Sequence, residues 1–398
     1  MYYSTIFVVF VSSLSIRVIT ALDPDALSQR YRNWTYYPDY IIPPLCLNPV
    51  TCPSHCNATF PYNNCQTDVF QIVQLPDEVE QNIFRAFYLQ YDGYGYETYS
   101  AISTDLVHFN VTNPGVVFSP RANRPGYPKP NPGEFDYASQ TFVGPLLMDY
   151  NVSQTRVLRR ATKNNTFWYA YLGFPTPGYE TPPGADGFAV STDGITWERS
   201  IPHPYIDTNI IHRAQEWEQF QVYAPYLIPA PDGTLASFYN AAHPTVRNEQ
   251  SGAAYLPGGP DALPGYDTTI NASMWIRDPA NPTLPNDEVA SFQAADPKVY
   301  YDDVQNVWVL IYFCNGNDSG GGAAICIAFS EDQRIWEKAS TPIYDHGGHP
   351  NGYDKCHTHK AWLQGDGKTD RLYLYYTGVS GDACQTRGIL LLTSTPIE

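Results

Sequence analysis

The sequence is poor in charge, and basic residues are especially scarce. Only 16% of its 398 residues are charged, and 40 acidic residues outnumber 23 basic ones, for a net charge of −17. The chain contains no run of Lys and Arg. Nucleic acids and anionic membranes attract proteins through clustered positive charge. The composition therefore disfavours both as partners and fits a neutral ligand.

Long apolar segments are also scarce, and the one near the N-terminus is short. Residues 5–16 are mostly apolar over a length that does not span a bilayer, and Ile19–Ala21 resembles a cleavage site. We therefore expect residues 1–21 to be a secretory signal peptide and the mature protein to be extracellular, without membrane contact. An uncleaved anchor is the alternative, because Arg17 follows the apolar segment and no basic residue precedes it.

The eight cysteines are an even set, which agrees with export to an oxidising compartment. Four of them crowd one loop-rich stretch, in which disulfides would take the place of a core: Cys46, Cys52, Cys56 and Cys65. Cys314 and Cys326 flank a Gly-rich turn and can bridge one hairpin, which leaves Cys356 and Cys384 as a further pair. The spacing does not settle these pairings. It disfavours a zinc site, because no paired C-x-x-C spacing occurs.

Sequons for N-linked glycans agree with export as well. Seven N-x-S/T sequences occur, at Asn33, Asn57, Asn110, Asn151, Asn164, Asn271 and Asn317. Chance alone produces several sequons in a chain of this length, so they support secretion only together with the signal peptide and the cysteines.

Helical periodicity is nearly absent, whereas 35 Pro and 28 Gly interrupt the chain. Aromatic residues make up 15%, with 32 Tyr. Aromatic side chains favour strands, and their rings also stack on sugar faces. These features predict an all-β fold.

A short motif occurs three times, at Ser103–Phe109, Ser191–Trp197 and Ser330–Trp336. Each copy reads S-x-D, followed four residues after the Asp by Phe or Trp. Such a sequence predicts a tight turn between strands. The Ser and Asp side chains bond nearby backbone N–H groups, and the aromatic ring anchors the outgoing strand.

Five aromatic-rich strands are predicted at residues 84–90, 167–172, 235–240, 307–313 and 372–376. Each is preceded by a strand with a polar start and an apolar end, at residues 68–73, 141–147, 222–228, 296–301 and 359–363. Five repeated units of this kind predict a five-bladed β-propeller over residues 66–398, with a Cys-rich N-terminal extension over residues 22–65 that caps or closes it. A β-sandwich is the alternative but does not explain the repeated strand order. WD40 and kelch propellers are disfavoured because their signature sequences are missing.

The first strand of each propeller blade lines the central channel, so polar residues at the starts of those strands are expected to converge. In chain order they are Asp68, Asp136 to Gln140, Glu218 to Gln221, Asp296, and His357 with His359. Converging carboxylates suit glycoside hydrolysis, in which one group protonates the leaving oxygen and another attacks carbon or activates water. Two of them also have a structural interpretation: Asp68 as a turn cap and Glu218 as a solvated loop acid. Asp136 is as suited to binding a sugar hydroxyl as to reacting.

Four of the nine histidines lie between residues 346 and 359. Strand alternation places His357 and His359 on one face. These side chains are candidates for sugar contact or proton transfer, for structural hydrogen bonding, or for a metal. No third ligand has a characteristic spacing, so we predict no metal and no cofactor.

The chain resembles the five-bladed glycoside hydrolases of families 43, 32 and 117 from about residue 66 to residue 394. The resemblance rests on the blade-start strands, the S-x-D turns and the Asp296–Val299 strand. It rests also on three further stretches: Gln221–Ala230 with Ser237–Ala242, Val309–Phe313 with Ile327–Ser330, and Gly348–Lys355. The W-x-N-D-P-N-G motif of invertases is missing, which disfavours fructan as the substrate.

The resemblance implies roles for particular residues. Asp68 would be the base, Asp296 a tuning or second acid, and either Glu218 or a late histidine, His349 or His359, the general acid. Asp136, Gln221, His349, His357 and Lys360 would bind the sugar.

Three other functions remain open. Sialidases share a Ser-x-Asp-aromatic turn, but they need several Arg for a carboxylate substrate, and the predicted channel-facing starts carry none. A sugar-binding propeller without catalysis is the second alternative, and a metal-dependent enzyme that uses the histidines is the third.

Overall fold

The computed structural model describes residues 22–45, 66–120, 130–161, 165–200, 204–206, 216–246, 248–263, 274–288, 290–315, 322–381 and 384–395. The predicted signal peptide and the four cysteines between residues 46 and 65 lie outside these ranges. So do the sequons at Asn57, Asn164, Asn271 and Asn317. No helix within the described residues is long and apolar enough to cross a membrane.

The predicted all-β fold is confirmed. Helices are limited to short segments such as α1 (Pro24–Ser28) and α2 (Pro76–Val79). The strands are β1 (Thr35–Tyr36), β2 (Gln66–Val73), β3 (Phe84–Tyr91), β4 (Tyr96–Ser103), β5 (Asn110–Phe118), β6 (Ser139–Pro145), β7 (Arg160–Ala161), β8 (Thr166–Phe174), β9 (Ala185–Ser191), β10 (Glu198–Arg199), β11 (Gln221–Pro229), β12 (Leu235–Ala242), β13 (Glu249–Leu256), β14 (Ile276–Arg277), β15 (Gln293–Asp302), β16 (Val307–Asn315), β17 (Ala324–Ser330), β18 (Glu337–Lys338), β19 (His357–Gly365), β20 (Leu372–Ser380) and β21 (Thr386–Thr393). All ten predicted strands are present, within a few residues of their expected bounds.

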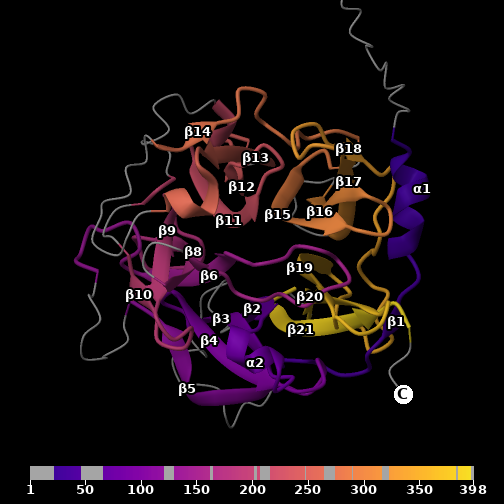
Figure 1. The fold of residues 1–398 in the computed structure, drawn as a ribbon, viewed down its shortest axis with the longest axis horizontal. Coiled ribbons are helices and arrows are strands. Elements are labelled where there is room, and N and C mark those ends of the chain that lie inside the picture. The colour runs from indigo at the N-terminus through magenta and orange to yellow at the C-terminus, as the bar shows by residue number, and fades with distance from the viewer. Residues whose placement is uncertain are drawn as a thin grey trace, which may run out of the picture.

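Within the described residues the strands form five antiparallel meanders. They are β2 to β5, β6 with β8 to β10, β11 to β14, β15 to β18, and β19 to β21 with β1. The third and fourth share one hydrogen-bonded sheet through a single parallel pair, Glu249 with Gln293. Figure 1 shows the meanders arranged around a common centre, with β2, β6, β11, β15 and β19 nearest to it.

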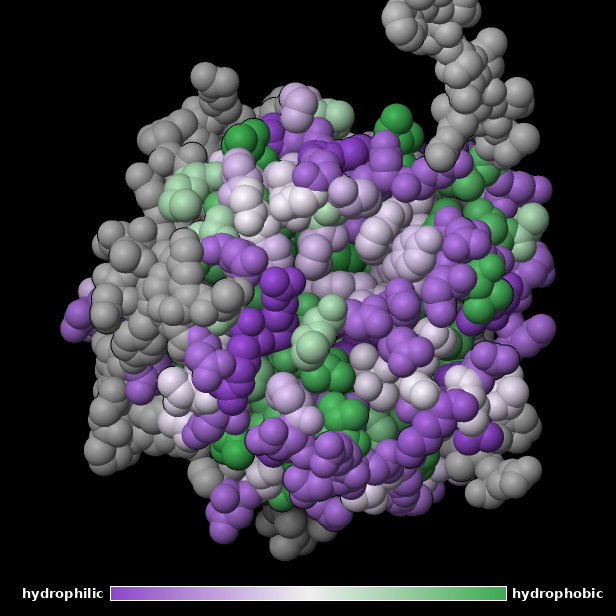
Figure 2. Space-filling model, in the orientation of Figure 1, coloured by the Kyte–Doolittle hydropathy of each residue, from purple (hydrophilic) through white to green (hydrophobic). Residues whose placement is uncertain are grey.

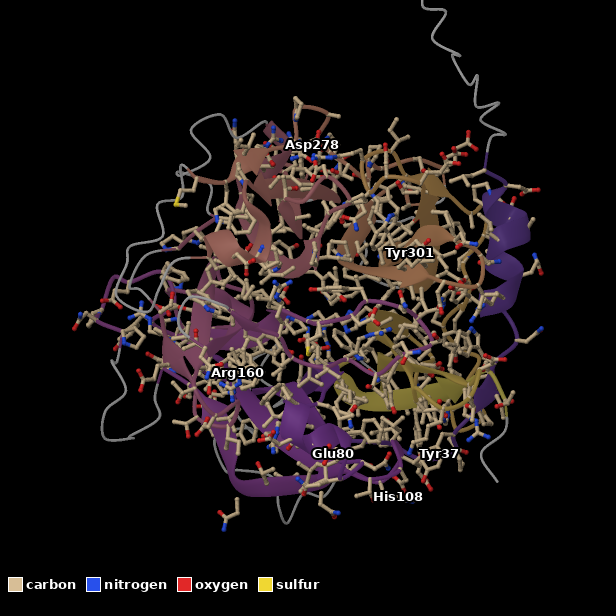
Figure 3. All side chains as sticks on the ribbon, in the orientation of Figure 1. Tyr37, Glu80, His108, Arg160, Asp278 and Tyr301 are labelled. Atoms are coloured by element: carbon tan, nitrogen blue, oxygen red, sulfur yellow. A yellow bond between two sulfur atoms is a disulfide. The ribbon has the colours of Figure 1, made fainter. Side chains whose placement is uncertain are left out.

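The N-terminal segment joins the last meander to the first. β1 pairs with β21, with Thr35 opposite Thr393. Tyr37, which follows β1, brings its hydroxyl within 3.4 Å of Nε2 of His108 in the first meander, and the two residues lie together in Figure 3. Tyr31 is fully buried and donates to Asp302 at 2.6 Å. The described part of the extension therefore contacts both the last meander and the first.

The core between the meanders is rich in aromatic residues, as the composition indicated. Phe142 stacks on Tyr169 with ring centroids 4.4 Å apart, and Trp197 meets Phe142 edge-on at 5.0 Å. The face drawn in Figure 2 carries hydrophilic side chains over most of its described surface, with smaller hydrophobic groups near the middle.

The three S-x-D turns have the predicted hydrogen bonds. In the second copy the hydroxyl of Ser191 accepts from the backbone N–H of Asp193 and Gly194. The Asp193 carboxylate accepts from the backbone N–H of Ile195 and Thr196, both within 2.8 Å. The same arrangement occurs in Ser103–Phe109 and Ser330–Trp336.

Two predicted disulfides are also confirmed. Cys314 and Cys326 bridge the β16–β17 hairpin, and Cys356 is joined to Cys384 between the start of β19 and the turn before β21. Both bridges lie next to strands that reach the centre of the molecule.

Replacing Asp193 with Ala should lower the free energy of unfolding by about 1–2 kcal/mol, because two backbone donors lose a charged acceptor. Urea denaturation measures this change. Asp370→Ala, at an exposed turn position, is the control. An equal loss in both variants would show that the S-x-D bonds do not stabilise the fold.

Candidate functional site

Each of the five inner strands, which are the strands nearest to the common centre, leaves its regular pairing with the neighbouring strand at one point. The pairing register shifts at one bulge residue in each strand: Val69 in β2, Val143 in β6, Ala224 in β11, Asp296 in β15 and Lys360 in β19. All five residues line one cavity. A bulge of this kind bends a strand and redirects a side chain, so the bulges determine which side chains face the centre.

Four of these five bulge residues have a left-handed backbone that non-glycine residues rarely adopt. The φ angles are 46° at Val69, 58° at Ala224, 54° at Asp296 and 53° at Lys360. Each such residue costs on the order of 1–3 kcal/mol and persists only where the surrounding packing enforces it. Strain repeated at equivalent positions makes the cavity the candidate functional site.

The cavity has a volume of about 210 Å³ and two chemically different halves. One half is lined by apolar side chains, chiefly Val69, Leu89, Val143, Leu172 and Ala224. The other is lined by polar side chains, chiefly Glu180, Glu249, Gln293, Asp296, His357, Lys360 and Arg387.

Asp68 lies behind the polar half and is only 1% exposed. One carboxylate oxygen accepts from Lys360 at 2.9 Å and from Arg387 at 3.0 Å, and the other accepts from Thr377 at 2.6 Å. Burial alone would raise the pKa of Asp68, but the charge of Lys360 and the other nearby cations outweighs burial and holds the pKa well below its usual range. Asp68 is therefore ionised and fully engaged by its neighbours.

The loop between β8 and β9 completes the polar half. Its Tyr179 hydroxyl accepts from Arg387, and the Glu180 carboxylate lies 3.5 Å from the Lys360 ammonium. Tyr179 and Glu180 both line the cavity. The two cations thus join the loop to Asp68.

Glu249, at the start of β13, is the carboxyl group whose protonation is most unusual. Its two oxygens accept from the side-chain amides of Asn240 and Gln293, each at 3.0 Å. Burial raises the pKa of Glu249 to about 7, and the negative charge of Glu180 adds to that rise. A carboxyl group in this state can give up a proton near neutral pH.

Asp296 faces the cavity from the fourth meander. Its carboxylate accepts from the Lys298 ammonium at 2.7 Å. Its backbone N–H donates to the Asn240 side chain at 3.3 Å, and the same Asn240 donates to Glu249. The Asn240 amide therefore links the backbone of Asp296 to the carboxyl group of Glu249.

His357 and His359 line the cavity, as strand alternation predicted. Burial lowers the pKa of His357 to about 4 and the pKa of His359 well below its usual range. Both rings are neutral near pH 7, so the 3.5 Å contact between His359 and Asp68 is not an ion pair. Neutral rings are suited to hydrogen bonding with a ligand and are poor proton donors.

Four of the candidate residues lie away from the cavity. Asp136 accepts from Tyr171 and Arg199, at 2.6 and 2.8 Å, within the second meander. Gln221 begins β11 and is buried without lining the cavity.

Glu218 and His349 are the other two. Glu218 forms a buried ion pair with Arg277 at 2.7 Å and accepts from Tyr239. His349 bonds the Tyr37 carbonyl at 3.1 Å, beside the N-terminal segment. The expectations for Asp136, Glu218 and Gln221 assumed that a polar start of an inner strand faces the centre, and it is the bulge position that decides this. His349 was expected only from the resemblance to family 117. The Arg277–Pro279 sequence matches a short Arg-Asp-Pro motif of invertases, but it also lies away from the cavity.

Sequence reasoning missed Glu180, Glu249 and Arg387. They come from a loop, a third strand and a final strand, whereas only inner strands were searched. A usable signal existed for Glu249, a carboxylate that opens a strand with no other charged residue. Arg387 places an Arg at the cavity from β21, although the starts of the inner strands carry none, as expected.

The histidines between residues 346 and 359 were one candidate for a metal site. Among the residues that the structure describes, no group of three or more His, Cys, Asp or Glu side chains is arranged to hold a metal ion.

Replacing Asp68 with Asn should destabilise the fold by about 3–5 kcal/mol, because two buried cations lose their shared counter-charge. The pKa of Asp68 is depressed on folding, so its stabilisation is present above the unfolded pKa of about 4 and is lost as the pH falls further. Urea denaturation between pH 3 and pH 6 tests both effects. The variant should show a flatter acid limb than wild type, with Asp370→Asn as control. Identical limbs would contradict this role of Asp68.

No protein-family model and no curated protein matches the chain. Solved structures do. A complex of BT0996 with RGII is 22% identical, with a TM-score of 0.69 over 95% of this chain and 97% of that one. A structure described as a glycoside hydrolase has the same identity and coverage with a TM-score of 0.70. Zg3597, a family 117 glycoside hydrolase from Zobellia galactanivorans, is 13% identical with a TM-score of 0.51 over 85% and 86%.

The same fold serves other reactions. An N-acetylgalactosamine deacetylase from F. plautii and a β-1,2-mannobiose phosphorylase from Listeria innocua each match with a TM-score of 0.52. Function therefore has to be argued from the site. The fold of this chain is that of the propeller glycoside hydrolases, as the resemblance of its motifs implied.

Proposed function

We propose that this protein is a glycoside hydrolase and that its five meanders are the blades of a propeller with the active site at the axial cavity. The observation that carries the proposal is Glu249, a carboxyl group with a pKa of about 7 at the cavity wall, linked through Asn240 to the ion-paired Asp296. Glycoside hydrolysis uses two carboxyl groups, one that donates a proton and one that acts as a nucleophile or base.

Glu249 acts as the general acid. Near neutral pH a large fraction of it is protonated, so it can donate to the leaving oxygen as the glycosidic bond breaks. Asp296 supplies the ionised carboxylate, which attacks the anomeric carbon or activates water. The Lys298 ammonium forms an ion pair with this carboxylate at 2.7 Å.

Asp68 has a different role from the base implied by the resemblance. It does not line the cavity, and Lys360, Arg387 and Thr377 occupy its oxygens. We assign it as a positioning residue that fixes the two cations. Lys360, His357 and Arg387 are placed to contact sugar hydroxyls.

The similar solved structures support a carbohydrate substrate, and the disulfides support secretion. One structural neighbour is a complex with RGII, which supports a carbohydrate as the substrate. Disulfides persist outside reducing compartments, so the two bridges support secretion of the mature protein. N-linked glycans remain expected, and the described sequon residues Asn33 and Asn110 are exposed.

Glu249→Gln should lower kcat by about 10²–10⁴-fold on a natural oligosaccharide, because the leaving oxygen loses its proton donor. Aryl glycosides with a very acidic phenol need little protonation and should lose far less. The wild-type rate should fall as the pH rises above about 7, and the variant should lose this limb. The measurement is hydrolysis of a panel of aryl glycosides and plant oligosaccharides, with exposed Glu331→Gln as control.

The leaving-group dependence separates an acid from a structural residue, since misfolding would depress all substrates alike. Equal losses on good and poor leaving groups would contradict the role of Glu249. Sugar binding without turnover on any substrate would instead favour a carbohydrate-binding propeller.

A further inference from the structure

The cavity extends from the starts of the inner strands to their bulges and ends there. In β15 it is lined by Gln293 and by the bulge residue Asp296, and in β19 by His357, His359 and the bulge residue Lys360. Among the described residues that line it, none belongs to an inner strand beyond the bulge. The bulges therefore mark the inner end of the cavity.

Buried aromatic side chains fill the centre of the molecule beyond the bulges. Tyr226, Tyr300 and Trp362 come from β11, β15 and β19, and each is 0% exposed. Their ring centroids lie 6.0 to 6.3 Å apart, so each ring contacts the other two. Arg156 is also fully buried, with its guanidinium 4.8 Å from the centre of the Tyr300 ring. This packing closes the inner end of the cavity on the side of these three strands.

Hydrogen bonds close the same end on the side of the first two meanders. Gln71, beyond the bulge of β2, donates to the Val143 carbonyl at 2.6 Å and accepts from the Tyr169 hydroxyl at 2.6 Å. Lys298, beyond the bulge of β15, is 2% exposed and lies 5.6 Å from the centre of the Tyr226 ring. Within the part of the chain that the structure describes, the open side of the cavity is therefore the side of the strand starts.

On that open side, the loop between β8 and β9 forms a barrier. The loop belongs to the second meander, yet the centre of its Tyr179 ring lies 5.7 Å from that of Tyr91 and 5.8 Å from that of Tyr96, both in the first meander. The Tyr179 hydroxyl accepts from Arg387 of the last meander, whose guanidinium lies 5.1 Å from the Tyr179 ring centre. The loop thus joins three consecutive meanders along one side of the opening, and a sugar chain cannot leave the cavity across that side.

The volume of the cavity suits a single sugar unit. It measures about 210 Å³, whereas sites that hold drug-sized ligands measure about 300–1,000 Å³. An enzyme that cuts within a polysaccharide needs a groove in which the chain continues in both directions from the bond that breaks. A closed inner end and a barrier along one side leave room for the chain in one direction only.

We propose that this protein is exo-acting: it binds the non-reducing terminal unit of an oligosaccharide in the cavity and releases that one sugar. The inference rests on the proposed function for its reaction, and on the closed end, the loop and the volume for its mode of action. Glu249 protonates the oxygen that joins the terminal unit to the rest of the chain, which extends out of the opening. The hydroxyl of a water molecule is added to the anomeric carbon, so the products are a monosaccharide and a chain shorter by one unit.

The test uses plant oligosaccharides of increasing length, labelled at the reducing end, and the same chains capped with a benzyl ether on the non-reducing terminal unit. Chains that are hydrolysed should shorten by one unit at a time, with a monosaccharide as the early unlabelled product. Capped chains should be cleaved at least about tenfold more slowly, because the cap has no space beside the bound sugar. Early release of longer fragments, or equal cleavage of capped chains, overturns the proposal and leaves glycoside hydrolysis standing.

Variants of Tyr179 test the barrier itself. Tyr179→Ala removes the ring and should raise the ratio of kcat/KM for capped over uncapped chains by about tenfold. Tyr179→Phe keeps the ring and loses only the hydroxyl that accepts from Arg387, so it should keep the wild-type ratio. Thr176→Ala, at an exposed position of the same loop, is the control. Because a ratio of two substrates does not depend on how much protein is folded, equal ratios in the Ala and Phe variants contradict the barrier.

Calorimetry with the same chains separates a failure of the reaction from a failure of the binding mode. If no chain is hydrolysed but uncapped chains bind and capped chains do not, hydrolysis is the part that fails and the pocket for a terminal sugar stands. If capped and uncapped chains bind equally, or neither binds, the exo-acting proposal is overturned as well.

Discussion

The cavity exists because each inner strand breaks its regular pairing at one equivalent point. A regular strand alternates its side chains between two faces, and neither face points along the common centre of five meanders. A bulge turns one side chain into that centre, at the cost of a left-handed backbone in four of the five strands. Closely packed aromatic rings behind the strands provide the rigidity that maintains the strained positions. The geometry of the site is therefore a consequence of packing elsewhere.

The charged side chains around the cavity also hold one another in place. Asp68, Lys360 and Arg387 are buried together, and the opposite charges offset the cost of removing each from water. Their network fixes Tyr179 and Glu180 of the neighbouring loop. Glu180 in turn helps to keep Glu249 protonated near neutral pH. Asp68 thus holds, through two cations, the loop whose Glu180 charge adds to the effect of burial on the pKa of Glu249.

Much of the fold was predictable from local chemistry. The S-x-D turns form because Ser and Asp side chains bond backbone groups only a few residues away. All the hydrogen bonds that define the turn therefore lie within the motif. The strands and the Cys314–Cys326 bridge are local in the same sense. Of the candidate site, Asp296, His357, His359 and Lys360 were found at the cavity wall. Asp136, Gln221, Glu218 and His349 were not, because the orientation of each depends on partners far along the chain.

What the sequence by itself determined is the class of fold, its repeated units and the turns that separate them, since these follow from periodicity and from contacts between near neighbours. Only the tertiary structure decided which carboxyl groups meet. Glu249 stands in a third strand and Glu180 in a loop, and both reach the cavity through the closure of the ring of meanders. Their protonation depends on burial and on each other's charge, and neither quantity exists until residues distant in sequence have been brought together.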